Sequence, residues 1–137
     1  MKVLLDTNIV IDFLTAREPF GELAKEVFEL VELKKIEGYL SSSSITTIHY
    51  LLTKVFDKNR ADDTIQKLLE LFFIATIDKE GFKDAINLNG YDFEDSVIIQ
   101  SAINKNIDII ISRDKKGFKN SPILTLEPRE FLATFEV

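Results

Sequence analysis

Three acidic side chains that are far apart in the sequence stand in equivalent places beside apolar segments. Asp6 ends an apolar run near the start of the chain, Asp114 closely follows the β-branched run 107–111, and Asp95 lies where the helix before that run begins. Carboxylates gathered without cationic partners repel one another, so at least one would take up a proton. A divalent cation removes that repulsion, and hard oxygen ligands with room for water suit Mg²⁺ or Mn²⁺. Metal sites of this kind serve phosphoryl transfer, by activating water and neutralising developing charge.

The elements around these acids are expected to bring them to one place. The run Val3-Leu4-Leu5 shows no alternation, which is typical of a strand buried on both faces, and 107–111 is the clearest strand in the chain. If the two strands are parallel, Asp6 and Asp114 share the carboxyl edge of the sheet, where open α/β sheets bind ligands. A helix that feeds a parallel strand runs antiparallel to it, so the helix start that carries Asp95 is expected at the same edge.

These acids also have purely structural interpretations, which the sequence leaves open. Asp6 or Thr7 could cap the first helix, because Asp and Thr are favoured N-cap residues. Asp92 and Asp95 match a capping box, with Asp92 as the N-cap and Asp95 at the third helical position. The interpretations are compatible, since Asp92 can cap the helix while Asp95 points into a crevice at the sheet edge.

Apolar spacing and turn residues predict the remaining elements. Helices are expected from Ile9, over 20–33, after the serine run 41–44, from an Asp62-Asp63 cap, over 79–89, from Asp92 and over 128–131, with short strands at 38–40, 73–77 and 123–125. Strands alternating with helices indicate an α/β fold with a parallel sheet covered on both faces. At 137 residues, the chain is expected to form a single domain, 1–137.

The composition excludes several classes of protein. Without Cys, disulfide frameworks and thiolate metal sites are excluded, which fits a cytoplasmic protein, and the single His argues against zinc. Asp6 and Asp12 interrupt the apolar N-terminus, so it is predicted to be neither a signal peptide nor a membrane span. The net charge of −6 argues against a protein that holds nucleic acid by bulk charge. A local basic patch remains, either as a solvated loop or as a binding site for nucleic-acid phosphates: Arg113, Lys115, Lys116 and Lys119.

Four short motifs in a characteristic order and spacing span nearly the whole chain: Leu4-Leu5-Asp6-Thr7-Asn8, Ser44-Ile45-Thr46, Asp92-Phe93-Glu94-Asp95 and Ile111-Ser112-Arg113-Asp114. With them the chain resembles the PIN-domain nucleases, of the VapC-like kind found as toxins of type II toxin–antitoxin pairs. The resemblance implies a PIN-like three-layer α/β/α sandwich with a parallel sheet of about five strands in the order 3-2-1-4-5. It also implies cleavage of single-stranded RNA with Mg²⁺ or Mn²⁺, a homodimer, and a small antitoxin that blocks the acidic crevice with Arg or Lys.

The resemblance also assigns roles to residues. It implies Asp6, Asp95 and Asp114 as the catalytic metal ligands, and three supporting polar groups: Thr7, Asn8 and Ser112. The chain departs from the family at two positions, because His49 stands where the family usually has a Glu on the third helix and Gly117 stands where an acid often precedes the Phe of the last loop. His49 either replaces a ligand, for which Asp92 could compensate, or is a satisfied group among core residues.

Rival functions are less consistent with the sequence. A receiver domain needs an adjacent acidic pair and a Lys after its last strand, which Thr125-Leu126-Glu127 does not supply. A haloacid-dehalogenase-type phosphotransfer domain needs a second Asp where this chain has Asn8. The remaining alternative is a non-catalytic PIN-like module that binds RNA or a protein. The missing Glu favours that module, and the three retained acids favour the nuclease.

Overall fold

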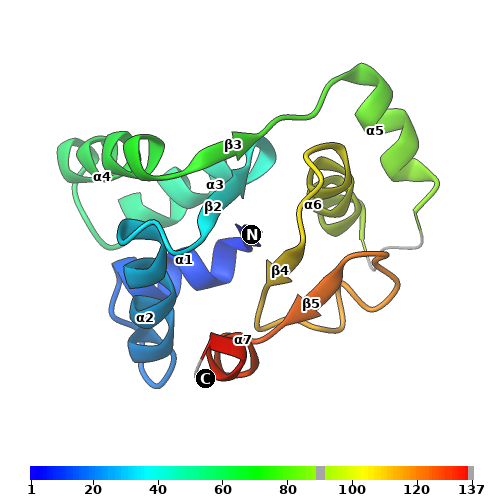
Figure 1. The fold of residues 1–137 in the computed structure, drawn as a ribbon. Helices are drawn as coiled ribbons and strands as arrows, with labels where there is room; N and C mark the ends of the chain where they lie inside the picture. Colours follow the sequence, from blue (N-terminus) through cyan, green and yellow to red (C-terminus); the bar gives the residue numbers. More distant parts are fainter. Residues whose placement is uncertain (89–91, 136–137) are drawn as a thin grey trace.

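The computed structural model describes residues 1–88 and 92–135, and these contain one five-stranded sheet. Its strands are β1 (Lys2–Leu5), β2 (Glu37–Ser41), β3 (Phe73–Ala75), β4 (Ile109–Ile111) and β5 (Leu124–Leu126). All neighbouring strands are parallel, and their order is β3-β2-β1-β4-β5 (Figure 1). The predicted α/β class and the strand order 3-2-1-4-5 are therefore confirmed. β1, which ends at Asp6, is the central strand.

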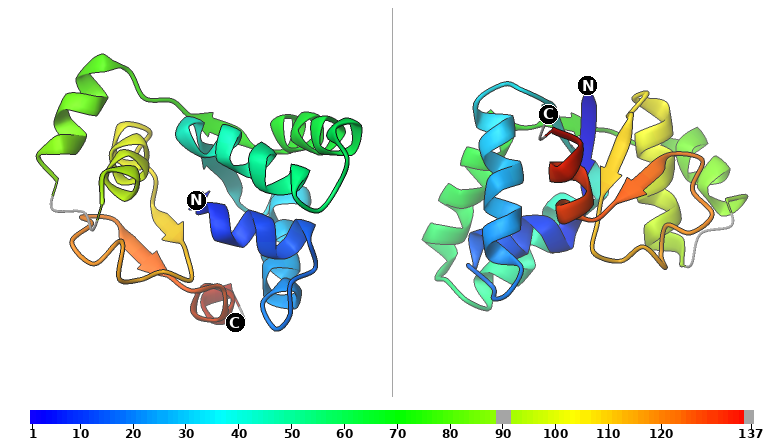
Figure 2. Two further views of the ribbon diagram at one scale, coloured as in Figure 1. Left: turned by 180° about the vertical axis from the view of Figure 1, so that it is seen from behind. Right: turned by 60° about the horizontal axis from the view of Figure 1, so that its bottom comes forward.

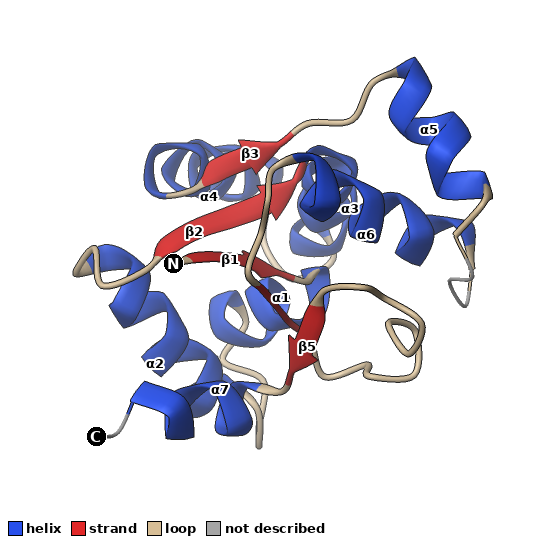
Figure 3. Ribbon diagram, turned by 45° about the vertical axis from the view of Figure 1, so that its right-hand side comes forward, coloured by secondary structure: helices blue, strands red, loops and turns tan. Residues whose placement is uncertain are grey.

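Seven helices in the described residues cover the sheet: α1 (Thr7–Leu14), α2 (Gly21–Glu32), α3 (Ser42–Thr53), α4 (Lys58–Leu71), α5 (Lys79–Ile86), α6 (Phe93–Asn104) and α7 (Pro128–Phe135). Figure 3 shows α5 and α6 on one side of the strands and α2 and α7 on the other, as in an α/β/α sandwich. In the described ranges, none of the helices is both long and apolar enough to span a membrane.

Side chains of β1 enter two apolar cores, one on each face of the sheet. Val3 and Leu5 pack in the larger core with residues of α1, α2, α3, α4 and α7, while Leu4 packs in the smaller core with residues of α6. All three side chains are fully buried. Burial of one such side chain contributes about 1.5–3 kcal/mol. Burial on both faces explains why this run does not alternate, and it fixes the strand end that carries Asp6.

α4 begins earlier than the sequence pattern predicts. Its N-cap is Asp57, whose Oδ1 accepts a hydrogen bond from the Arg60 amide at 2.8 Å, while Asp62 and Asp63 lie inside the helix. The predicted Asp62-Asp63 cap and the polar turn before it were wrong. Asp57 supplies the same capping chemistry more than one turn earlier, and no Gly or Pro between the two positions delays the helix.

The ends of two other helices also differ from the predictions. α5 ends at Ile86, before the predicted end at Asn89, and the predicted stop signal Asn89-Gly90 lies outside the described residues. α7 continues to Phe135, because Phe131 and Phe135 extend its apolar stripe and their ring centroids lie 5.0 Å apart.

Several helices begin at the carboxyl edge of the sheet, and α1 and α3 do so directly after β1 and β2. α2 and α6 lead into parallel strands, so their first residues lie at that edge, and α7 starts directly after β5. Figure 2 shows α2 and α7 side by side, on the opposite side of the sheet from α6. The first turns of these helices therefore surround the ends of β1 and β4.

Candidate active site

Asp6 is both the N-cap of α1 and the buried centre of a polar network. The amide of Thr7 donates a hydrogen bond to its Oδ1 at 2.8 Å, so the capping interpretation is correct. The hydroxyl of Ser112 donates to its Oδ2 at 2.7 Å, and Asn8 Nδ2 lies 3.3 Å from the same oxygen. The Ser112 hydroxyl also accepts from the amide of Asp114 at 2.9 Å. Together these bonds join the carboxyl ends of β1 and β4, as the sequence predicts.

The carboxylates of Asp95 and Asp114 meet beside Gly117. A Cβ atom at Gly117 would lie 2.5 Å from Oδ2 of Asp95 and 2.9 Å from Oδ2 of Asp114, and real Cβ atoms do not approach other atoms so closely. The amide of Gly117 also donates to Oδ1 of Asp114 at 3.2 Å. Both carboxylates therefore occupy space that exists only because residue 117 has no side chain.

Asp92 takes the structural role that the capping box predicts. Its carboxylate accepts a hydrogen bond from the amide of Asp95 at 2.8 Å, as the N-cap of α6. Asp92 is exposed, whereas Asp95 is half-buried and lines a groove at the sheet edge. The two interpretations of this motif thus hold together: Asp92 caps the helix, and Asp95 faces the groove.

The acids of the site raise one another's pKa values. Burial, and then the charges of Asp92, Asp6, Asp114 and Glu94, raise the pKa of Asp95 to about 7. Burial also raises the pKa of Asp6; the hydrogen bonds from Ser112 and Thr7 oppose this effect, and the charges of Asp114 and Glu94 add to it. Shifts of this kind cluster at functional sites, because such sites gather like charges in partly dry surroundings.

The groove at the sheet edge has a volume of about 270 Å³ and an acidic wall. It is lined by Asp6, Thr7, Asn8, Ile11, Asp12, Arg17, Leu51, Glu94, Asp95, Ile98 and Arg113. Of its two cations, Arg113 is already bound to Asp12, with Nε 2.5 Å from Oδ2 and Nη2 3.1 Å from Oδ1. The hydroxyl oxygen of Thr7 is buried and has no hydrogen-bond partner among the described residues. Because the carboxylates that line the groove outnumber its two arginines, the groove retains an excess of negative charge.

The three predicted ligands do not form a finished metal cage. In the ranges 1–88 and 92–135, no set of three or more Asp, Glu, His or Cys side chains is arranged closely enough to hold a metal ion by itself. Asp114, which is exposed, is not among the residues that line the groove. The site thus consists of electrostatically coupled acids that share one edge and leave positions for other ligands.

The fold and site have known counterparts. A family model described as PIN domain matches residues 2–116. The chain belongs to the PIN-domain family. It is 28% identical over 135 residues to a protein named ribonuclease VapC1 from Aquifex aeolicus (strain VF5), and the match covers 95% of this chain and 92% of that protein. The PIN-domain resemblance predicted from the four motifs is confirmed.

Solved structures with the same fold include toxin–antitoxin proteins. VapBC2 from Rickettsia felis, bound to a DNA fragment from its promoter, matches with a TM-score of 0.71 and 19% identity, covering 93% of this chain and 98% of that one. VapC20 from Mycobacterium tuberculosis, described as a sarcin-ricin loop cleaving toxin, matches with a TM-score of 0.69 and 15% identity, covering 89% and 96%. At these identities the likeness establishes the PIN fold alone.

His49 of this PIN domain does not line the acidic groove. Its Nε2 lies 2.6 Å from Oδ1 of Asp62 on α4, and its side chain is 36% exposed. Ile48 and Leu52 form the buried stripe of α3, so His49 lies beside that stripe instead of within it. Of the two alternatives for His49, a place among core residues is therefore wrong. The residue that α3 contributes to the groove is Leu51.

The predicted basic patch is partly occupied by ion pairs. Arg113 is bound to Asp12, and Lys115 Nζ lies 2.6 Å from Glu130 Oε1. Lys116 and Lys119 are exposed. RNA binding by this loop stays a prediction.

Three charged groove residues of the PIN domain were given no role from the sequence. Arg17, Glu94 and Asp12 were not predicted as site residues, although all three line the groove. Asp12 had a detectable signal in the sequence, because it is a charged residue within the apolar run 9–14 and lies four residues after Asn8, on the same helix face. In the structure its side chain is 1% exposed. Asn8 Oδ1 lies 3.4 Å from the amide of Arg113, whose side chain Asp12 binds. One face of α1 therefore binds both the backbone and the side chain of Arg113.

Proposed function

We propose that this PIN domain is a ribonuclease that hydrolyses phosphodiester bonds of single-stranded RNA and acts as the toxin of a toxin–antitoxin pair in the cytoplasm. The observation that carries the proposal is the group of coupled acids Asp6, Asp95 and Asp114 at the carboxyl edge of the sheet. The similarity to ribonuclease VapC1 supports it along nearly the whole chain. Cleavage of labelled RNA by the purified chain, dependent on added metal, tests it.

The carboxylates at this edge of the sheet form a donor set that fits Mg²⁺ or Mn²⁺. All candidate ligands are carboxylate oxygens, which hard cations prefer, and the buried Thr7 hydroxyl has no hydrogen-bond partner among the described groups. Mg²⁺ usually keeps several waters and is held by one or two carboxylates together with substrate phosphates, so a complete protein cage is not required. Asp6, Asp95 and Asp114 would hold the ion, which when bound neutralises phosphate charge and activates water.

The neighbouring polar groups orient these acids. Ser112 and Asn8 hold Oδ2 of Asp6, and the Gly117 amide holds Oδ1 of Asp114, which leaves other lone pairs of both carboxylates for a ligand. Such fixed hydrogen bonds keep the carboxylates in place before substrate arrives, as preorganised sites require. Asp92 contributes its charge to the pKa of Asp95 while its carboxylate remains engaged as the helix cap.

Removing the charge of Asp95 is expected to stabilise the metal-free protein at alkaline pH. The pKa of Asp95 rises from 3.8 to about 7 on folding, so the folded state binds this proton more tightly than the unfolded chain. Stability therefore falls as pH rises from about 4 to about 7. Asp95→Asn lacks this penalty, so in EDTA at about pH 8 its Tm should exceed that of the wild type by a few degrees, and the two should converge at about pH 4. Thermal unfolding across this pH range measures the effect.

Millimolar Mn²⁺ is expected to remove or reverse that difference. It should raise the Tm of the wild type, because a ligand that binds only the native state stabilises it by mass action, and it should raise the Tm of Asp95→Asn much less. Asp84→Asn, which removes an exposed carboxylate on α5, serves as the control and should keep the full Mn²⁺ effect. An unchanged wild-type melting curve with Mn²⁺ would contradict the metal site.

The proposed assembly includes a homodimer and an antitoxin. The solved structures with the same fold include toxin–antitoxin proteins, which supports the antitoxin partner. An acidic groove of about 270 Å³ suits an Arg or Lys side chain, since Arg–carboxylate pairs are often bidentate. Light scattering at micromolar concentration should give twice the chain mass of 15.7 kDa. A monomer alone would count against the dimer.

A non-catalytic module that binds RNA or protein is the second candidate. His49 favours it, because this position is turned to Asp62 on α4 and adds no ligand to the groove. Such a module would bind labelled RNA but leave it intact with every divalent metal tested, whereas the nuclease would cut it.

A further inference from the structure

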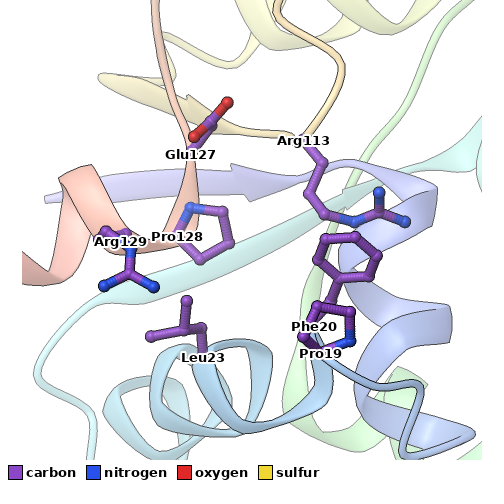
Figure 4. A pocket seen from close by; sticks show the side chains of 7 residues that line it. All are labelled: Pro19, Phe20, Leu23, Arg113, Glu127, Pro128 and Arg129. Carbon is purple, nitrogen blue, oxygen red and sulfur yellow. The ribbon is translucent and has the colours of Figure 1, made fainter.

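A second cavity, here named the α2–α7 pocket, opens at the same edge of the sheet as the acidic groove. It has a volume of about 280 Å³, close to the lower limit for small-molecule sites of roughly 300 Å³. Figure 4 shows its lining: Pro19, Phe20 and Leu23 from the start of α2, Glu127, Pro128 and Arg129 from the start of α7, and Arg113 from the segment after β4. None of these residues except Arg113 belongs to the site described above.

The side chain of Arg113 separates the two cavities. It lines both the acidic groove and the α2–α7 pocket. Its guanidinium is held on one side by Asp12 and lies over the ring of Phe20, with Cζ 3.8 Å from the ring centroid. Arg has five N–H donors, and the bonds to Asp12 use two of them, so others remain for a ligand. A ligand that crosses from one cavity to the other would pass this guanidinium.

The lining of the pocket suits an unpaired nucleotide. Pro19, Phe20, Leu23 and Pro128 supply apolar surface for the faces of a base. Arg113 and Arg129 supply positive charge for its phosphate, and they outnumber the one carboxylate of the lining, Glu127. Arg129 is exposed and has no ion-pair partner within residues 1–88 and 92–135. Proteins that bind single-stranded nucleic acid combine these two features, a cationic path for the backbone and apolar or aromatic platforms for the bases.

We propose that the α2–α7 pocket binds the base and phosphate of the RNA nucleotide next to the one whose phosphate lies at the acidic groove. This inference rests on the proposed ribonuclease function and adds a substrate subsite to it. The RNA backbone then runs along Arg17, Arg113 and Arg129. Lys115, which an RNA path over the basic loop would need, is already paired with Glu130.

Filling the pocket and removing its free cation test the subsite. Leu23→Trp places a large ring in the pocket, and Arg129→Ala removes the charge at its rim. Each variant is expected to raise KM for 5′-labelled single-stranded RNA of randomised sequence by roughly tenfold, because one base contact in single-stranded complexes has about that value. The value of kcat should change less than about twofold, because neither side chain contacts the acids.

The matched controls lie at the opposite edge of the sheet. Leu33→Trp and Lys35→Ala make the same changes at exposed positions after α2 and should leave KM unchanged. Sequencing of the cut ends adds a readout that altered folding does not produce. The wild type should show a nucleotide bias at one position beside the cut, and Leu23→Trp should lose it.

The outcomes separate this inference from the proposed function. A wild type that does not cut RNA overturns the ribonuclease and the subsite with it. If the wild type cuts RNA but Leu23→Trp and Arg129→Ala change neither KM nor the cut-site bias, the subsite alone is overturned. The pocket would then be a binding site for a protein partner. A raised KM in Lys119→Ala, with Arg129→Ala unaffected, also overturns it, because the RNA path then follows the basic loop.

Discussion

Asp95→Asn is expected to lower the rate of RNA cleavage by about 10²- to 10³-fold without weakening RNA binding. Asp95 is the proposed ligand whose pKa is raised to about 7 by burial and by four neighbouring carboxylates. A group that stabilises charge developing in the transition state contributes mainly to the rate, and its removal typically costs this factor. RNA affinity should stay constant or rise, because the variant removes a negative charge from a groove that faces phosphates. Cleavage of labelled RNA and fluorescence anisotropy in EDTA measure the two effects separately.

Glu94→Gln is the matched control for this variant. Glu94 lies on the same turn of α6, lines the same groove and loses the same charge, yet it is not a proposed ligand. Its rate should fall by less than about tenfold, since only the general field of the site changes. If Asp95→Asn cuts RNA as fast as the wild type, the nuclease proposal is wrong and the binding module replaces it.

Gly117→Ala is expected to produce the second large loss of activity, of about 10²-fold. The new Cβ would lie 2.5 Å and 2.9 Å from the carboxylate oxygens of Asp95 and Asp114, so both side chains must move. These oxygens are the ends of short side chains, which can turn aside without unfolding the chain. A displacement of about 1 Å in a catalytic constellation costs a factor of this size. Turnover of labelled RNA measures the loss, with thermal unfolding alongside to check the fold.

Gly81→Ala is the control variant, because it also adds a Cβ atom in a crowded place but outside the site. Its Cβ would lie 2.6 Å from Cγ1 of Ile77, an apolar side chain beside α5 that does not line the groove. This variant should lose some stability and retain kcat. If Gly117→Ala retains full activity, the space beside residue 117 does not position the two acids.

The convergence of the acids could be predicted from the sequence because strand ends and helix starts follow from simple rules. Asp6 ends a run buried on both faces, and parallel pairing of β1 with β4 places Asp114 at the same edge. The antiparallel course of α6 then adds Asp95. The strand order itself came from the resemblance to PIN domains, since alternating helices and strands fit other parallel sheets equally well.

The details that the sequence did not predict depend on contacts between distant segments. The pairing of Asp12 with Arg113 joins residues 101 positions apart, and the binding of His49 to Asp62 joins α3 to α4. Gly117 was noted only as a missing acid, because its contact with the carboxylates of Asp95 and Asp114 depends on the path of the loop. The start of α4 was missed for a local reason: several Asp residues could cap it, and the earliest one does.

The most direct test of the central claim is cleavage of 5′-labelled single-stranded RNA of randomised sequence by the wild-type chain under three conditions. The samples contain millimolar Mn²⁺ or Mg²⁺, excess EDTA, or EDTA followed by an excess of the metal. A randomised substrate prevents sequence preference from hiding the activity. We expect cleavage with metal, none in EDTA and recovery when metal is restored. Equal cleavage in EDTA would contradict the metal site, and RNA that binds yet stays intact in every metal would contradict the ribonuclease.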